Sequence, residues 1–139
     1  MYEKTFGDKS LLFSKRVADI ALFEWKENEQ TASCLVIGEN EEAKALTMIL
    51  ETRCREADRI PVPQKTYDII FLTDAYDIHQ LKGIADRETL VVDASVSKAV
   101  RYFDPTLPFR QVRIVSLAEE NTKYGQNRYQ KYELVQDLQ

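Results

Sequence analysis

Side chains able to bind a ligand or a metal ion follow three mostly apolar runs of this 139-residue chain. The runs, residues 33–37, 67–72 and 89–93, are predicted to be strands of a parallel sheet. Carboxyl ends of parallel strands meet at one edge of a sheet, where open α/β proteins bind their ligands. The sequence therefore predicts one ligand-binding edge, with the candidate residues Gly38, Glu39, Asn40, Thr73, Asp74, Tyr76, Asp93 and Ser95.

The turn after residue 37 indicates what kind of ligand this edge suits. Strand–turn–helix units that bind nucleotides use several glycines, so that the backbone can approach a phosphate closely. Here Gly38 is followed by Glu39, Glu41 and Glu42, which stand where a phosphate would sit. These carboxylates already complement the positive end of a helix starting near residue 41. We therefore expect no cofactor, and a Gly38 with either a positive φ or close packing against that helix.

Three acidic candidates suggest a cation site as an alternative. Glu39, Asp74 and Asp93 would share the sheet edge and could hold Mg²⁺ with several waters retained. We favour the interpretation that each caps the helix after its strand. His79 is either a general base or, as we favour, an ordinary surface histidine. Ser95 has no nearby His–acid pair, so the sequence predicts no catalytic residue and no metal site.

Composition and charge narrow the function classes. The chain has 44% hydrophobic and 30% charged residues, which is typical of one soluble globular domain spanning residues 1–139. A net charge of −4 argues against a nucleic-acid binder. No apolar run reaches the ~18–20 residues that span a bilayer, and no signal peptide is evident, so we expect a cytoplasmic protein. Cys34 and Cys54 occupy apolar positions and are expected to be buried free thiols.

Further elements complete the predicted fold. Apolar stripes predict helices at 10–26, capped by Ser10, and at about 41–57. Short helices are expected at 74–84 and 97–103, and Ile60–Pro63 is at most a short edge strand. Alternating residues at 110–117 and 127–135 predict an antiparallel hairpin. The predicted fold is a three-layer Rossmann-like α/β sandwich, with a mostly parallel sheet and a C-terminal antiparallel hairpin.

The sequence Tyr-Asp-Ile-Ile-Phe-Leu-Thr-Asp at residues 67–74 resembles a strand of S-adenosylmethionine-dependent methyltransferases and the related spermidine synthases. These families carry a YDxIxxD strand, then a strand ending near an acid, then a terminal antiparallel hairpin. The same order of elements covers roughly residues 10–135. The resemblance implies a Rossmann-like fold with S-adenosylmethionine or another nucleotide-type ligand at the carboxyl strand ends.

Three other resemblances are more local. Residues 68–72 and 89–95 are similar to paired strands of dehydrogenase Rossmann domains. Residues 36–43 are similar to the acidic first turn of response-regulator receivers, with Asp74 near the place of the phospho-acceptor. Gly38-Glu39 and Asp74-Ala-Tyr-Asp77 are loosely similar to the acidic motifs of the Toprim nuclease fold.

The scaffold together with its acidic, glycine-poor turn predicts a non-catalytic, degenerate Rossmann-like domain. We expect it to act by binding a protein partner or by self-association as a homo-oligomer. Tyr124, Tyr129 and Tyr132 form an aromatic cluster that could supply an interface anchor. The alternative is a binder of a small nucleotide-like ligand, or a methyltransferase-like enzyme, that uses the polar side chains at the carboxyl strand ends.

Overall fold

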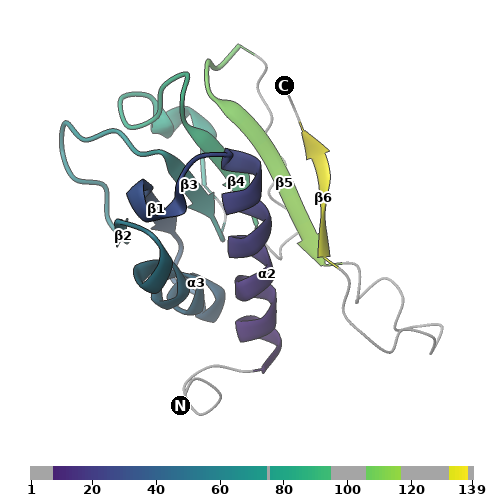
Figure 1. Cartoon of the computed structure of the whole chain (residues 1–139). Coiled ribbons are helices and arrows are strands. Elements are labelled where there is room, and N and C mark those ends of the chain that lie inside the picture. The colour runs from purple at the N-terminus through teal and green to yellow at the C-terminus, as the bar shows by residue number, and fades with distance from the viewer. Residues whose placement is uncertain (1–7, 75, 95–105, 117–131, 138–139) are drawn as a thin grey trace.

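The computed structural model describes residues 8–74, 76–94, 106–116 and 132–137. The elements in chain order are α2 (Asp8–Trp25), η1 (Glu29–Thr31), β1 (Ser33–Ile37), α3 (Glu41–Arg53), β2 (Glu56–Asp58), β3 (Ile69–Leu72), η2 (Ile78–Leu81), β4 (Leu90–Asp93), β5 (Arg110–Ser116) and β6 (Tyr132–Asp137). The strands form one six-stranded sheet in the order β2-β1-β3-β4-β5-β6 (Figure 1).

Five neighbouring strands of this sheet, β2-β1-β3-β4-β5, are parallel. The central strands β1 and β3 are buried along almost their whole length, which is why their sequences are continuously apolar. The predicted α/β class with a parallel sheet is therefore confirmed. Beyond β5, strand β6 pairs antiparallel, with a register shift between Arg113 and Ile114. The connecting residues 117–131, with Tyr124 and Tyr129, and the side chain of Tyr132 lie outside the described part.

Both α-helices cover the same face of the sheet (Figure 1). Side chains of α2 such as Val17, and of α3 such as Leu46, pack against Val36 and Phe71 of the strands in one buried cluster. The helices are also linked directly, because the hydroxyl of Ser14 donates a hydrogen bond to the carbonyl of Glu42 at 3.1 Å.

The opposite face has a different cover. A second buried cluster there joins strand side chains to Tyr67, Ile78, Leu81 and Phe109, which come from loops and from η2. Over the described residues, loops therefore take the place of the third layer that we predicted, because the only helix at Asp74 and residues 76–84 is the four-residue 3-10 helix η2. The helix predicted at 97–103 lies outside the described residues.

Some predicted boundaries are also wrong. Helix α2 begins at Asp8, before Ser10, so Ser10 lies inside the helix instead of capping it. Helix α3 ends at Arg53, because Cys54 has extended backbone angles and the chain then enters β2. The edge strand is β2, and not Ile60–Pro63, since the amide-lacking prolines suit a loop. Within the described ranges, no helix combines the length and apolar character needed to cross a bilayer.

Candidate functional site

The strand order creates a topological switch point between β1 and β3. From β1 the chain crosses through α3 to β2 on one side, whereas β3 and β4 extend the sheet on the other side. Ligands of open α/β sheets bind in the crevice at the carboxyl ends of such strands. The structure brings Gly38 and Asn40, which follow β1, together with Thr73, which follows β3, at this crevice.

Side chains of the protein bridge the crevice. The Oδ1 atom of Asn40 accepts a hydrogen bond from the amide of Ala43 at 2.9 Å and so caps α3. The Nδ2 atom of Asn40 donates to the carbonyl of Thr73 at 2.8 Å. In return, the amide and the Oγ1 hydroxyl of Thr73 both donate to the carbonyl of Ile37, each at 2.9 Å. The end of β1 and the turn after it are therefore tied to the end of β3 by the side chains of Asn40 and Thr73.

The position that a Cβ atom of residue 38 would take is already filled by Thr73. The φ of Gly38 is +143°, as we expected, and a Cβ atom built on it would lie 1.9 Å from Oγ1 of Thr73. The close neighbour is thus the end of β3, whereas Ala43 of α3 would lie at an ordinary 3.5 Å. The carbonyl of Gly38 accepts a hydrogen bond from the guanidinium of Arg59 at 2.5 Å. The backbone of the turn is therefore committed to contacts within the protein.

The acidic candidates do not gather into one site. Glu39 and Asp74 are exposed, whereas Asp93 faces Arg113 on β5, with 3.8 Å between Oδ2 and Nε. No group of three His, Cys, Asp or Glu residues suited to a metal ion occurs in the part of the chain that the structure describes. Tyr76 packs against the loop-side cluster. Ser95 lies outside the described residues.

The capping roles that we favoured for the acidic candidates are also wrong where the structure describes the following helix. The cap of α3 is Asn40 instead of Glu39, and the cap of η2 is Asp77 instead of Asp74. His79 is exposed, as we expected, and its Nδ1 atom lies 2.9 Å from Oδ1 of Asp77. The same Asp77 oxygen accepts a hydrogen bond from the backbone amide of His79.

A second polar cluster, at β2, was not predicted from the sequence. The ammonium of Lys65 lies 2.6 Å from Oε2 of Glu56 and 3.0 Å from Oδ2 of Asp58. The hydroxyl of Tyr67 donates to the same Asp58 oxygen at 2.7 Å, and Lys65 lies 5.0 Å from the centre of the Tyr67 ring. The hydroxyl of Ser33 donates to Oε2 of Glu56 at 2.7 Å. These contacts hold the loop after β2 against the edge of the sheet.

Acid should weaken this β2 cluster. The hydrogen bond from Lys65, followed by that from Ser33, lowers the pKa of Glu56 below its ordinary 4.5. Burial by itself raises the pKa of Asp58, but the hydrogen bonds from Tyr67 and Lys65 outweigh it and hold this pKa below 3.8. A carboxyl with a lowered pKa in the folded state stabilises the protein above its unfolded pKa, and that contribution is lost as the pH falls through the folded value.

We therefore predict that the free energy of unfolding falls between about pH 5 and pH 3, partly through this cluster. Lys65→Met should remove about 1 kcal/mol at pH 7 and much less at pH 3, because protonated carboxyls no longer attract the ammonium. Urea unfolding of both proteins at each pH measures the difference. Lys44→Met, which removes an exposed lysine of α3 outside this cluster, serves as the control. An equal loss at both pH values would contradict the assigned ion pairs.

Comparison with known proteins identifies no family for this chain. A scan against protein-family models finds no match, and no curated protein or solved structure matches the chain significantly. The similarity of residues 67–74 to methyltransferases and spermidine synthases therefore stays an expectation from the sequence.

Proposed function

We propose that this chain is a non-catalytic, Rossmann-like α/β domain that acts by binding a protein partner or a second copy of itself. The main support for this proposal is that side chains of the protein already bridge the switch point between β1 and β3. Asn40 and Thr73 join the two strand ends there, and the Cβ position of Gly38 is already filled by Thr73. A phosphate or ribose in the usual pose would need this same space.

The β2 edge is the surface that we assign to the interaction. Strand β2 pairs with β1 and ends one side of the sheet, as Figure 1 shows. In the loop that follows, the side chains of Ile60 and Val62 are exposed by 76% and 45%. Pro61 and Pro63 restrict φ and favour an extended segment. Exposed apolar residues beside a strand edge are typical of interaction surfaces.

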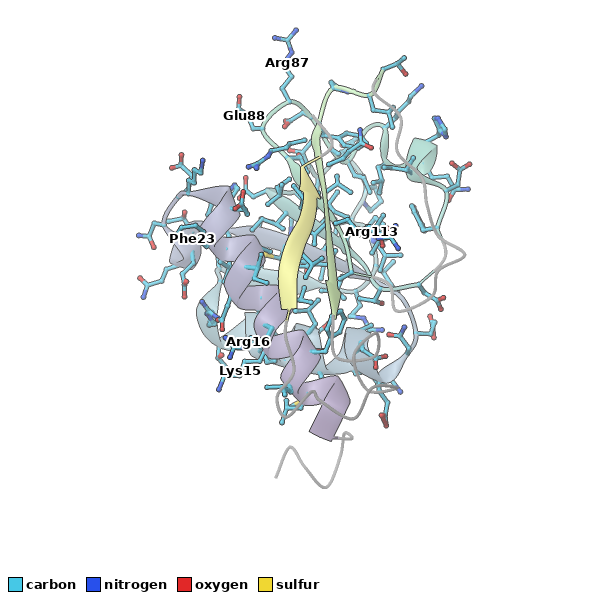
Figure 2. The ribbon with its side chains drawn as sticks, turned by 90° about the vertical axis from the view of Figure 1, so that its right-hand side faces the viewer. Lys15, Arg16, Phe23, Arg87, Glu88 and Arg113 are labelled. Carbon is cyan, nitrogen blue, oxygen red and sulfur yellow. The ribbon has the colours of Figure 1, made fainter. Side chains whose placement is uncertain are left out.

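The test compares two exposed apolar positions of the molecule. Size-exclusion chromatography with light scattering should give a mass above the 16.1 kDa of one chain, or a pull-down should retain a partner. The double change Ile60→Lys with Val62→Lys should abolish that association, because it places two charges in an apolar contact. Phe23→Lys is the matched control. Phe23 is also 76% exposed, but it lies on α2, on the helix side of the sheet (Figure 2).

The alternative function, binding of a nucleotide-type ligand at the carboxyl strand ends, has one observation in its favour. Among the described side chains, the buried nitrogen or oxygen atoms without a hydrogen-bond partner are Nε of Arg59 and Nε of Arg113. Arg59 reaches the turn after β1, and Arg113 lies on the face opposite the α-helices (Figure 2). Cationic groups at this edge would suit an anionic ligand.

A thermal-shift screen separates the two functions. S-adenosylmethionine, NAD(P) and nucleotides are added near millimolar concentration, each with Mg²⁺ and with EDTA. A ligand at 100 times its dissociation constant stabilises the fold by about 2.7 kcal/mol. We expect no shift for any of them. A strictly monomeric chain that captures no partner, and that one of these ligands stabilises, would overturn the proposed function in favour of the alternative.

A further inference from the structure

The loop between β2 and β3 contains a strained turn. The carbonyl of Val62 accepts a hydrogen bond from the amide of Lys65 at 3.2 Å, which closes a β-turn over residues 62–65. Pro63 suits the second position of such a turn, but Gln64, at the third, has a φ of +65°. Glycine or asparagine normally occupies a position with this φ, because other side chains are strained there. Contacts from elsewhere in the protein must therefore hold the turn.

The hydroxyl of Tyr67 supplies a contact at the centre of the loop. It accepts a hydrogen bond from the amide of Val62 at 3.1 Å and donates one to Oδ2 of Asp58 at 2.7 Å. Because Asp58 is the last residue of β2, one oxygen atom ties the loop to the end of this strand. The Tyr67 ring belongs to the buried cluster on the loop side of the sheet, and the residue is only 2% exposed. The hydroxyl therefore has a fixed position from which to hold Val62.

The two basic residues that flank the loop are held as well. At its start, the guanidinium of Arg59 donates to the carbonyl of Gly38. At its end, the ammonium of Lys65 lies in the ion pairs of the β2 cluster. Between these two anchors, the apolar side chains of Ile60 and Val62 are exposed. The polar contacts thus fix the loop from both ends and from its centre, while its apolar side chains face solvent.

The loop has no amide to offer a second strand at residues 61–63. Pro61 and Pro63 have no amide hydrogen, and the amide of Val62 already donates to Tyr67. Strand addition at a sheet edge depends on main-chain hydrogen bonds. Another molecule would therefore contact the apolar side chains of this loop, and their arrangement depends on the shape of the turn.

We propose that Tyr67 is the positioning residue of a latched loop, residues 60–66, whose strained turn keeps Ile60 and Val62 presented at the β2 edge. Without the Tyr67 hydroxyl, the turn is released toward the negative φ that Gln64 favours, and the two apolar side chains lose their fixed arrangement. A loop that is ordered before it meets its partner loses less conformational entropy on binding. The role of the latch in recognition rests on the proposed function, whereas the latch itself is a property of the free chain.

The test removes the hydroxyl by Tyr67→Phe, which keeps the buried ring. Native-state hydrogen exchange of the Val62 and Lys65 amides should become about tenfold faster or more, since two hydrogen bonds are lost. Trypsin should also cut the native variant at Arg59 or Lys65 about tenfold faster than the wild type. Cleavage at Lys82, which is exposed and outside the loop, is the internal reference and should not change.

Tyr76→Phe is the matched control for the lost hydroxyl. Tyr76 packs against the same buried cluster but lies outside the loop and its latch. Its change should leave exchange and cleavage of residues 60–66 as in the wild type. In the association assay of the proposed function, Tyr67→Phe should weaken binding about tenfold and Tyr76→Phe should not.

The strain at Gln64 is tested separately. Glycine accepts a positive φ, so Gln64→Gly should keep the protection of the Val62 amide and raise the melting temperature by about 3 °C. Gln64→Ala removes the same side chain but not the strain, so it should give no such rise. A Gln64→Gly protein that melts no higher than Gln64→Ala would overturn the strained turn.

Two further results would overturn the latch. These are unchanged exchange and cleavage of the loop in Tyr67→Phe, and a Val62 amide that exchanges in the wild type as fast as in an unstructured peptide. If Tyr67→Phe fails to fold, the wild-type exchange and the two Gln64 variants decide the question. A chain that never associates would contradict the proposed function and leave the exchange data to judge the latch, whereas association unaffected by a released loop would overturn the role of the latch in recognition.

Discussion

Replacing Gly38 by alanine should lower the free energy of unfolding by about 3–5 kcal/mol, the largest effect that we predict for a single substitution. Two separate causes add. An alanine at φ +143° is strained, and its Cβ would lie 1.9 Å from Oγ1 of Thr73. Thr73 is 2% exposed and its hydroxyl is held by the carbonyl of Ile37, so it cannot move aside without breaking that hydrogen bond. Urea unfolding of the variant measures the loss.

Gly83 is the matched control for this substitution. It also has a positive φ, +94°, but a Cβ there would meet no atom within 4 Å. Gly83→Ala should therefore cost only the backbone strain, about 1–2 kcal/mol. In addition, Thr73→Ala removes the clashing oxygen, so combining it with Gly38→Ala should cost less than the sum of the single changes. Two results together would contradict the close contact between Gly38 and Thr73. These are an equal loss of unfolding free energy for Gly38→Ala and Gly83→Ala, and a loss in the double variant equal to the sum of the Gly38→Ala and Thr73→Ala losses.

Asn40→Ala should cost about 2–3 kcal/mol, because one side chain serves two elements. Its loss uncaps α3, which costs about 1 kcal/mol. It also leaves the carbonyl of Thr73 without the donor that now lies 2.8 Å away, which costs a further 1–2 kcal/mol. Chemical unfolding compared with wild type measures the sum.

Asn40→Asp separates the two contributions. An aspartate keeps the oxygen that accepts from Ala43 and suits the helix N-terminus, but it has no Nδ2 donor for Thr73. We expect it to lose only the part due to the Thr73 contact. An Asn40→Asp protein as stable as wild type would contradict the bridge across the switch point, and with it the main support for the proposed function.

Together these predictions treat the candidate binding residues as residues that stabilise the fold. Gly38, Asn40 and Thr73 were singled out as possible ligand contacts, and the structure places them in contact with one another, with neighbouring backbone and with the side chain of Arg59. This arrangement is the reason for assigning the interaction to the β2 edge, where Ile60 and Val62 are exposed.

The sequence was sufficient to predict the strands that lie inside the sheet. Residues 33–37 are β1 as predicted, and β3 and β4 fall within the predicted runs 67–72 and 89–93. These strands are covered on both faces, so burial demands apolar residues at successive positions, and that demand is visible in the sequence. The two α-helices were likewise predicted, because each needs an apolar stripe to pack on the sheet.

The edge strand β2 was beyond sequence reasoning, whereas β5 was predicted within 110–117 from its alternating residues. Strand β2, with the sequence Glu-Ala-Asp, has neither an apolar run nor a strand-like composition. It is a strand because β1 pairs with it and because Lys65 and Ser33 satisfy the Glu56 carboxylate. The helix predicted at 74–84 is also mostly loop in the described residues, because a short segment is enough to bury its apolar side chains. Its apolar residues Ile78 and Leu81 reach the core from the four residues of η2.

The switch point shows most clearly the difference between what the sequence determines and what only the tertiary structure determines. The sequence by itself determined a single-glycine, acidic turn after β1, and hence a poor site for a phosphate. Only the tertiary structure decided that Thr73 fills the space above Gly38 and that Asn40 reaches the Thr73 carbonyl, 33 positions away in the chain. The physical reason is that parallel pairing of β1 with β3 sets which distant residues meet, and no local pattern records that pairing.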